Sequence, residues 1–224
     1  MEYNALIDSV RVHLDRLRVA CNIDAGKPVT EKALAKAERQ MSIRLPAQLR
    51  EFYQAIGNGF SFDWSADPDS SNSPFGGLTV PKLSHLSEWY IGWQRGALYS
   101  PEEGERYGFP YTDDPALAKI TAAKMWHWLP VIQEGNGDQL CIDLGDPSCP
   151  VVFDQHDWLD GGTGENGHVL ASNWANFLTD WASVCFQRPK SLYWPNCFRS
   201  DGGISWNGDQ FRSPFRIDGM AKTA

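Results

Sequence analysis

Two carboxylates four residues apart, Glu134 and Asp138, lie between apolar runs in WLPVIQEGNGDQLCIDL, residues 128–144. A carboxylate pair can act as general acid and base, or bind a metal ion. Asn136-Gly137 favours a different interpretation, because this dipeptide between apolar runs is the strongest short-range signal for a two-residue hairpin turn with positive φ at both centres. Both carboxylates would then flank the turn and face water, where they make poor general acids. The sequence favours a hairpin, with a metal site or a catalytic pair as the alternatives.

Two further segments resemble ligand-binding loops. Residues 162–167, GTGENG, satisfy the GxGxxG pattern, but no strand leads directly into them and Glu165 stands where a pyrophosphate would lie. Residues 67–78 begin like a calcium loop, yet the sixth position is Asn72 instead of glycine and the twelfth is Leu78 instead of glutamate. We therefore expect flexible loops, with no cofactor and no metal ion.

A single histidine has neighbours suited to catalysis. The segment DQHD places His156 between Asp154 and Asp157, an arrangement that can orient an imidazole. No serine elbow, reactive-cysteine signature or second histidine at a recognisable spacing accompanies it. A turn after a strand is the favoured interpretation, and a hydrolase using His156 is a distant alternative.

The cysteines and the hydropathy profile indicate a cytoplasmic protein. The 224 residues include five cysteines, an odd number without CxxC or Cys/His zinc spacing, which suggests free thiols in a reducing compartment. No run of about eighteen apolar residues predicts a membrane span. The first residues carry charges throughout and do not resemble a secretory signal.

Negative charge is concentrated in the middle of the chain. Residues 63–187 hold 5 Lys and Arg against 18 Asp and Glu, a net charge of −13, whereas the whole chain carries −8. Such a field repels nucleic acid and attracts basic proteins. We expect a basic protein partner, with a generally acidic soluble protein as the alternative.

Helical spacing dominates the beginning of the chain. Apolar residues from Leu6 to Cys21 predict a first helix ending near residues 22–26. Thr30 is the expected N-cap of a second helix, and Pro46 is expected in the first turn of a third, which Gly57-Asn58-Gly59 ends.

Strands and a closing helix are predicted farther along. Short β-like runs are expected at 60–64, 78–80, within 128–144 and at 150–154, a helix at 84–99, and a last helix after Ser172. The order indicates an α+β fold: N-terminal helices, a central, mainly antiparallel sheet and a closing helix. We expect one domain over residues 1–186 with an insert near 84–124, and a C-terminal extension, or appendage, over residues 187–224.

Three of these stretches together resemble the SUKH superfamily, in its Smi/Knr branch. ALAKAERQMSIRLPAQLREFYQAIGNGF, residues 33–60, resembles the opening helices of the family. Residues 128–144 resemble its central hairpin, and SNWANFLTDWASVCF, residues 172–186, its closing helix. The insert and the extension depart from a minimal family member.

The resemblance implies an α+β fold and a protein that acts by protein–protein interaction, without catalysis. Bacterial members of the family are immunity proteins that bind and neutralise toxins, often nucleases, and eukaryotic relatives are linked to cell-wall synthesis. A toxin-immunity protein with a basic nuclease partner is the first hypothesis. A scaffold or regulator of envelope synthesis is the second. We expect no nucleic-acid or membrane partner, and a homodimer is possible.

An inhibitor of this kind should present its charge on loops, with aromatic anchors between the acids. The alternative for each tryptophan is a place in the core. The expected partner-binding residues are Trp64, Asp67, Asp69, Trp93, Glu102, Glu103, Asp113 and Asp114.

Overall fold

The computed structural model describes residues 2–70, 73–95, 123–156, 166–190 and 192–220. Its α-helices are α1 (Tyr3–Arg16), α2 (Glu31–Met41), α3 (Ala47–Ala55), α4 (Leu83–Arg95) and α7 (Trp174–Ala182). Its strands are β1 (Cys21–Ala25), β2 (Phe60–Ser65), β3 (Phe75–Val80), β4 (Trp128–Gln133), β5 (Gln139–Asp143), β6 (Val151–Asp154) and β7 (Val169–Ala171). Two short 3-10 helices follow, η3 (Trp194–Cys197) and η4 (Ser213–Phe215).

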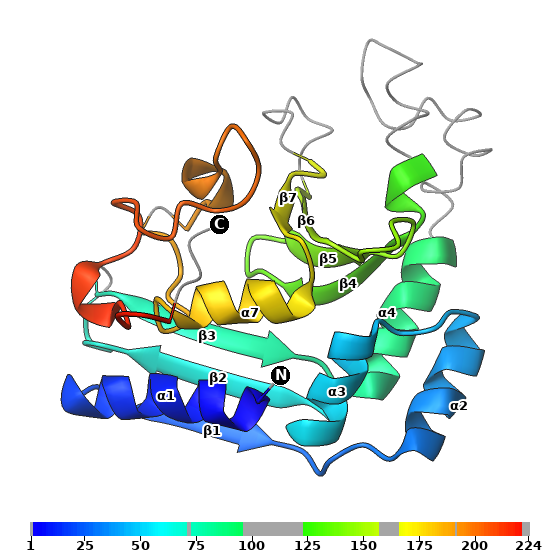
Figure 1. The fold of residues 1–224 in the computed structure, drawn as a ribbon, viewed down its shortest axis with the longest axis horizontal. Helices are drawn as coiled ribbons and strands as arrows, with labels where there is room; N and C mark the ends of the chain where they lie inside the picture. Colours follow the sequence, from blue (N-terminus) through cyan, green and yellow to red (C-terminus); the bar gives the residue numbers. More distant parts are fainter. Residues whose placement is uncertain (1, 71–72, 96–122, 157–165, 191, 221–224) are drawn as a thin grey trace.

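The strands form two antiparallel sheets, one of three strands in the order β1-β2-β3 and one of four strands in the order β4-β5-β6-β7. Strands β3 and β4 bring the two sheets together. In Figure 1, α1 lies in front of β1 and β2, and α7 crosses beside β3 and β4. The chain is therefore α+β, with N-terminal helices, antiparallel sheets and a closing helix, as the sequence predicts.

The first helix is shorter than predicted. It ends at Arg16, and Arg18 has a φ of 58°, a left-handed conformation that turns the chain back. Cys21, expected on the helix, starts β1 instead. Cys21 matched the apolar spacing of the predicted helix because its side chain packs against the core, but it does so from a strand.

The next two helices begin and end close to the predicted positions. The hydroxyl of Thr30 accepts a 3.3 Å hydrogen bond from the Ala33 amide, which confirms the expected N-cap. Pro46 occupies the N-cap of α3, one residue before the first turn. Gly57 has a φ of 143° and ends the helix, and a Cβ there would lie 2.1 Å from the Gly26 carbonyl oxygen.

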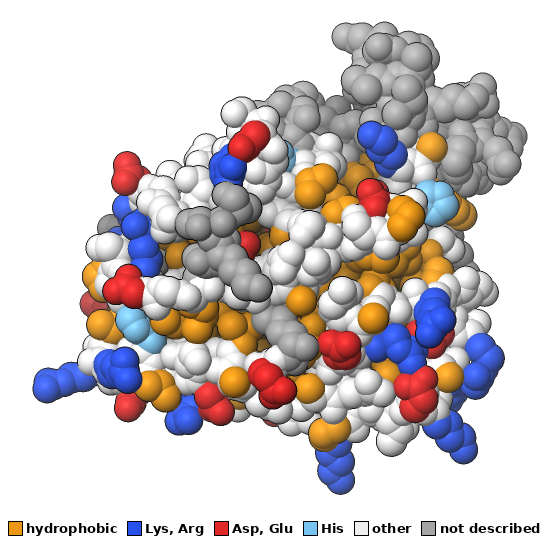
Figure 2. Space-filling view, viewed as in Figure 1, with side chains coloured by type: hydrophobic (Ala, Val, Ile, Leu, Met, Phe, Trp, Pro, Cys, Tyr) orange, Lys and Arg blue, Asp and Glu red, His pale blue; other side chains and the backbone are white. Residues whose placement is uncertain are grey.

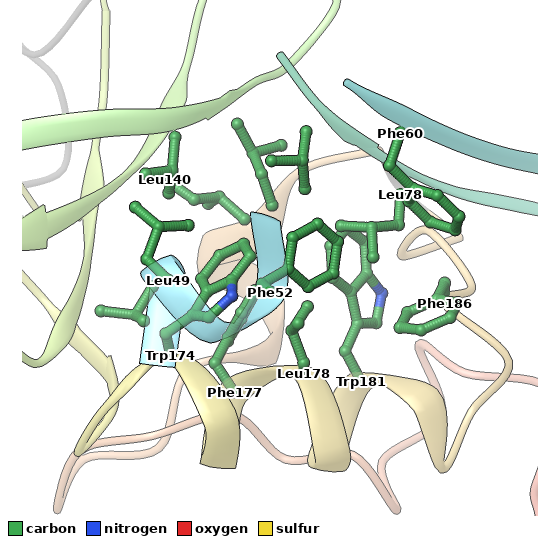
Figure 3. Packing of buried hydrophobic residues seen from close by; sticks show 14 of the residues in the cluster. Leu49, Phe52, Phe60, Leu78, Leu140, Trp174, Phe177, Leu178, Trp181 and Phe186 are labelled. Carbon is green, nitrogen blue, oxygen red and sulfur yellow. The ribbon is translucent and has the colours of Figure 1, made fainter. Parts of the chain in front are cut away.

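The core joins α7 to both sheets. Figure 3 shows aromatic side chains of α7 pointing towards Phe52 of α3 and the apolar side chains of the strands. The ring centroids of Phe52 and Trp174 are 6.0 Å apart in an edge-to-face arrangement, and those of Trp181 and Phe186 are 5.7 Å apart. Asn173, one residue after the predicted Ser172, caps α7 by accepting a hydrogen bond from the Asn176 amide.

The C-terminal extension contributes to the same core. Its buried apolar residues join the cluster formed by the helices and the sheets; these residues are Trp194, Cys197, Ile204, Trp206, Phe211 and Phe215. Phe215 stacks on Trp64 of β2 with ring centroids 4.5 Å apart. An antiparallel bridge between Phe198 and Ile204 encloses a turn in which the Gly202 amide donates to the Arg199 carbonyl at 3.1 Å. The described part of the extension therefore packs against the core of residues 1–186.

The predicted insert is described only in part. Helix α4 occupies its first residues, where the sequence suggested a helix over 84–99. Residues 96–122 lie outside the described part of the chain.

Candidate functional site: a buried carboxylate cluster and an acidic sheet face

The β4–β5 hairpin closes through a three-residue loop. The Glu134 amide donates to the Asp138 carbonyl at 2.8 Å, and the Gly137 amide donates to the Glu134 carbonyl at 3.1 Å. Gly137 has a φ of 99°, but Asn136 does not belong to the described residues with positive φ. The loop is therefore a turn followed by a left-handed glycine bulge, and the expected two-residue turn was wrong. The hairpin itself is confirmed.

Asp138 is buried, contrary to the expectation that it faces water. Only 1% of its side chain is exposed. One carboxylate oxygen accepts bonds from the His156 amide at 3.1 Å and from His156 Nδ1 at 2.8 Å, and the other accepts from Asn136 Nδ2 at 2.7 Å. A carboxylate that only accepts requires the proton on Nδ1 of the imidazole. Asp138 therefore ties the hairpin tip to the end of β6.

Glu134 is also withdrawn from water. It pairs with Arg188 of the C-terminal extension, and the two side chains are 11% and 16% exposed. The guanidinium carbon of Arg188 lies 5.2 Å from the ring centroid of Trp181, a cation–π distance. Burial lowers the pKa of Arg188 to about 10. The two hairpin carboxylates therefore bind different partners and do not form an acid/base pair.

Asp154 is the third buried carboxylate of this region. Burial raises its pKa to about 7; the Asp138 charge also raises it, and His156 acts in the opposite direction. Asp154 lies opposite Gln139 in the β5–β6 ladder. Cys141, two residues farther along β5, has a pKa raised well above its usual range by burial and by Asp154, so it remains a neutral thiol. We call Glu134, Asp138, Asp154, His156 and Arg188 the buried carboxylate cluster.

The arrangement of the buried carboxylate cluster is better explained by structural pairing than by a catalytic or metal-binding role. Glu134 pairs with the Arg188 guanidinium and Asp138 with the His156 imidazole, and these bonds join the β4–β5 hairpin to the end of β6 and to the extension. Within the described ranges, no group of three His, Cys, Asp or Glu side chains is placed to hold a metal ion. The histidine segment DQHD follows β6 as a turn up to His156, and Asp157 lies outside the described residues.

The structure divides the expected partner-binding residues into three groups. Trp64 is in the core, 4% exposed, and its Nε1 donates to the Cys185 carbonyl at 2.7 Å, so it is no surface anchor in this structure. Asp67 and Asp69 are exposed in the β2–β3 loop, where an Asp67 carboxylate oxygen accepts from the Asp69 amide at 3.1 Å. Trp93 belongs to α4, but its side chain is outside the described part. The other four acids also lie outside it: Glu102, Glu103, Asp113 and Asp114.

An acidic surface that the sequence did not predict lies on the outward face of the three-stranded sheet. Alternation along β2 buries Phe60, Phe62 and Trp64 and turns the residues between them outward. The register with β1 and β3 places the other outward positions beside them; this outward face consists of Asn22, Asp24, Ser61, Asp63, Ser65, Phe75, Gly77 and Thr79. It carries two carboxylates and no lysine or arginine. We call it the acidic sheet face.

The acidic sheet face continues into the loop that holds Asp67 and Asp69. A hollow with a volume of about 800 Å³ lies at this end of the sheet, and its lining includes Arg18, Asn22, Asp63 and Phe75. Figure 2 shows the helix-covered side of the molecule, where Lys and Arg side chains alternate with Asp and Glu around the rim. The sequence missed the acidic sheet face because β1 was predicted to be helical.

Comparison with known proteins agrees with this architecture. The SMI1/KNR4 family, SUKH-1, matches residues 28–180, more than half of the chain. The chain belongs to this family. The match runs from the loop before α2 into α7, and so includes the hairpin and most of the buried carboxylate cluster. No curated protein matches the chain.

Members of this family are generally non-enzymatic, and their domain fits the roles of immunity proteins or of SMI1/KNR4-type proteins. Across the described ranges, no helix combines the length and the hydrophobicity that a membrane crossing requires.

Proposed function

We propose that this protein is an immunity protein that binds a basic toxin, of the nuclease type, and neutralises it without catalysis. The observation that carries the proposal is the acidic sheet face, which presents Asp24 and Asp63 on a regular scaffold with no cation among its outward positions. Asp67 and Asp69 extend the same charge into the adjoining loop. Complementary charge speeds the encounter with a basic protein and disfavours other partners.

The buried carboxylate cluster supports a binding role in a different way. Glu134 pairs with Arg188, and the buried Asp138 accepts a hydrogen bond from His156, whose side chain is 43% exposed. Their charges therefore add little to the outer field, and the acids of the sheet face and its loop supply it. The sheet holds Asp24 and Asp63 in fixed positions, which lowers the entropy cost of binding.

A second candidate is a scaffold or regulator of envelope synthesis, which the family membership also fits. The two candidate functions differ in the partner that each requires. An immunity protein is expected beside a gene for a large secreted protein with a toxic C-terminal region, and it should rescue growth when that region is expressed.

The test is co-expression with the product of the adjacent upstream gene in a growth assay, followed by measurement of association rates at two ionic strengths. The test variant neutralises Asp24, Asp63, Asp67 and Asp69 by replacement with Asn. The control variant removes the same charge elsewhere, through replacement of the exposed acids Glu88, Asp146, Asp209 and Asp218 by Gln or Asn.

We expect the test variant to associate more slowly than the control variant and to respond less to salt, since surface charges act within about 10 Å at 0.1 M salt. Equal rates and equal salt response in both variants would show that this surface is not the binding surface. Absence of growth rescue by the parent protein would contradict the immunity function itself.

A further inference from the structure

We infer that the partner adds an extended strand to the free edge of β1, with apolar and basic side chains in alternation. This inference rests on the proposed function and deepens it, since it names the backbone that the basic partner binds and the sequence pattern of its binding segment.

Strand β1 is the edge of the three-stranded sheet that the described chain leaves open, whereas β4, at one edge of the other sheet, lies next to β3. At the other end of the three-stranded sheet, the Gly77 amide of β3 donates to the Phe186 carbonyl at 2.9 Å, and the Arg188 amide donates to the Phe75 carbonyl at 3.1 Å. In the four-stranded sheet, the Gly203 amide donates to the Val169 carbonyl of β7 at 2.7 Å. Residues of the C-terminal part thus cover both of these edges, and β1 has β2 alone as its neighbour.

The backbone of β1 is positioned to bond outward. In an antiparallel ladder, residues that bond to the partner strand alternate with residues whose amide and carbonyl point away from it. The Gly26 amide donates to the Gly59 carbonyl at 2.9 Å, which places Asp24 and Asn22 in the bonded series with β2. Ile23, Ala25 and Cys21 therefore direct their amides and carbonyls towards the open side, where no turn, loop or cap of the described chain hydrogen-bonds to them.

The side chains beside this edge define the chemistry of the added strand. On the inward face, Ile23 is 43% exposed, although it lies opposite the buried Phe62 in β2. An apolar side chain on an added strand would cover it. On the outward face, Asp24 of β1 and Asp63 of β2 offer carboxylates within the span of a Lys or Arg side chain. Alternation along a strand then requires apolar and basic residues in turn.

The charge near this edge favours a basic partner over a second copy of this chain. A second copy would bring a protein of net charge −8 against one of the same charge, and its own Asp24 against this acidic sheet face. Arg18 lies before β1 and Lys27 after it, outside the five residues that form the strand. Pairing of two five-residue strands also buries much less area than a stable dimer needs.

Two peptides of equal composition test whether an extended strand adds to the edge of β1. The first is Lys-Val-Lys-Val-Lys-Val-Lys, and the second is Lys-Lys-Lys-Lys-Val-Val-Val, both with blocked ends. The measurement is hydrogen exchange of the Ile23 and Ala25 amides by NMR. We expect the alternating peptide to slow exchange at both amides at least several-fold, because each amide gains a hydrogen bond. The block peptide should have little effect.

A proline variant provides the matched protein control. Ile23→Pro removes an outward amide and leaves the ladder with β2 intact, since edge strands accept proline where the amide faces solvent. It should abolish the effect of the alternating peptide on the Ala25 amide, whereas Ile23→Thr, which keeps the amide and a β-branched side chain, should retain it. If Ile23→Pro fails to fold, Ala25→Pro makes the same test, read at the Ile23 amide.

Equal protection by both peptides, no protection by either, or protection that appears without peptide as the protein concentration rises would overturn the inference. The last outcome would assign the edge to a second copy. Growth rescue by the parent and by Ile23→Pro alike would overturn strand addition and leave the immunity function standing. Protection by the alternating peptide without growth rescue would contradict the immunity function alone.

Discussion

At the scale of single residues, the carboxylates near the hairpin are defined by partners far away in the chain. Glu134 pairs with Arg188, 54 residues later, and Asp138 binds His156, 18 residues later. Local sequence marks both acids as turn residues, and nothing in their neighbourhood predicts burial. Two carboxylates four residues apart are therefore weak evidence for a shared site, because each can bind a partner on a different strand or loop.

The first prediction concerns Glu134→Ala. Because Arg188 would remain buried without its carboxylate, we expect the free energy of unfolding to fall by about 2–3 kcal/mol in urea titration. If Glu134 were exposed to water, as the sequence suggested, the substitution would leave the free energy of unfolding nearly unchanged. Glu88→Ala, at an exposed position of α4, is the control. Adding Arg188→Ala to Glu134→Ala should cost less than the sum of the two single changes. Unchanged stability with lost function would instead support an active-site role for Glu134.

The second prediction concerns Asp154→Asn and pH. The pKa of Asp154 is raised from 3.8 to about 7 in the folded protein, so the folded state binds the proton more tightly than the unfolded state. Its contribution to stability is present below pH 3.8 and is lost as the pH rises towards 7. The variant should therefore gain stability relative to the parent across this range, by at most about 1.4 kcal/mol per pH unit.

Urea titrations of both proteins between pH 4 and pH 8 measure this difference, and Asp209→Asn, at an exposed position, is the control. A constant difference between parent and Asp154→Asn at every pH would show that Asp154 ionises normally in the folded state.

At the scale of elements, the sequence predicted those parts whose signals are local. The N-cap at Thr30, the stop at Gly57 and the hairpin at residues 128–144 depend on a few neighbouring residues, and the structure confirms them. Strand β1 was missed because it is an edge strand with the burial pattern of one half-buried and four exposed residues, which lacks apolar alternation. The acidic sheet face was missed with it.

The C-terminal extension was difficult for a related reason. It has 3-10 turns and no helical or strand period, although it inserts aromatic side chains into the core. Packing of this kind depends on contacts with distant elements, which a single sequence does not reveal. The division of the chain at residue 186 stays a prediction about domain organisation.

The third prediction concerns Phe215→Ala. Loss of the ring stacked on Trp64 should lower the free energy of unfolding by about 3 kcal/mol and admit water to the indole. Urea titration and a red shift of tryptophan fluorescence measure the two effects. Leu192→Ala, at a residue of the same segment that is 58% exposed, should change neither. Parent-like stability for Phe215→Ala would mean that the extension contributes little to the core.

At the scale of the whole molecule, the count of acids overstates the charge that a partner meets. The central segment carries a net −13 in sequence, but Glu134, Asp138 and Asp154 are withdrawn into the buried carboxylate cluster. The position of the remaining acids matters more than their number. Asp24, outside that segment, contributes to the acidic sheet face because of the strand that holds it.

The fourth prediction is that calcium, zinc and dinucleotides leave the melting temperature unchanged. A ligand that binds only the folded state must raise it. The acids at the hairpin are already bonded to protein groups, and the described ranges contain no cluster suited to a metal. Differential scanning fluorimetry with each ligand is the measurement. A clear upward shift with any of them would contradict our interpretation of the acidic and glycine-rich loops.

The extension that covers the edges of β3 and β7 also determines when the protein can finish folding on the ribosome. The α-helices and both sheets are synthesised before residues 194–215, which complete the core. Until then, a nascent chain exposes Trp64 and the edge of β7 to its surroundings. Chaperones that bind apolar segments should therefore stay with this chain until residues 194–215 have been synthesised, and slow translation of these residues would prolong the period in which it aggregates.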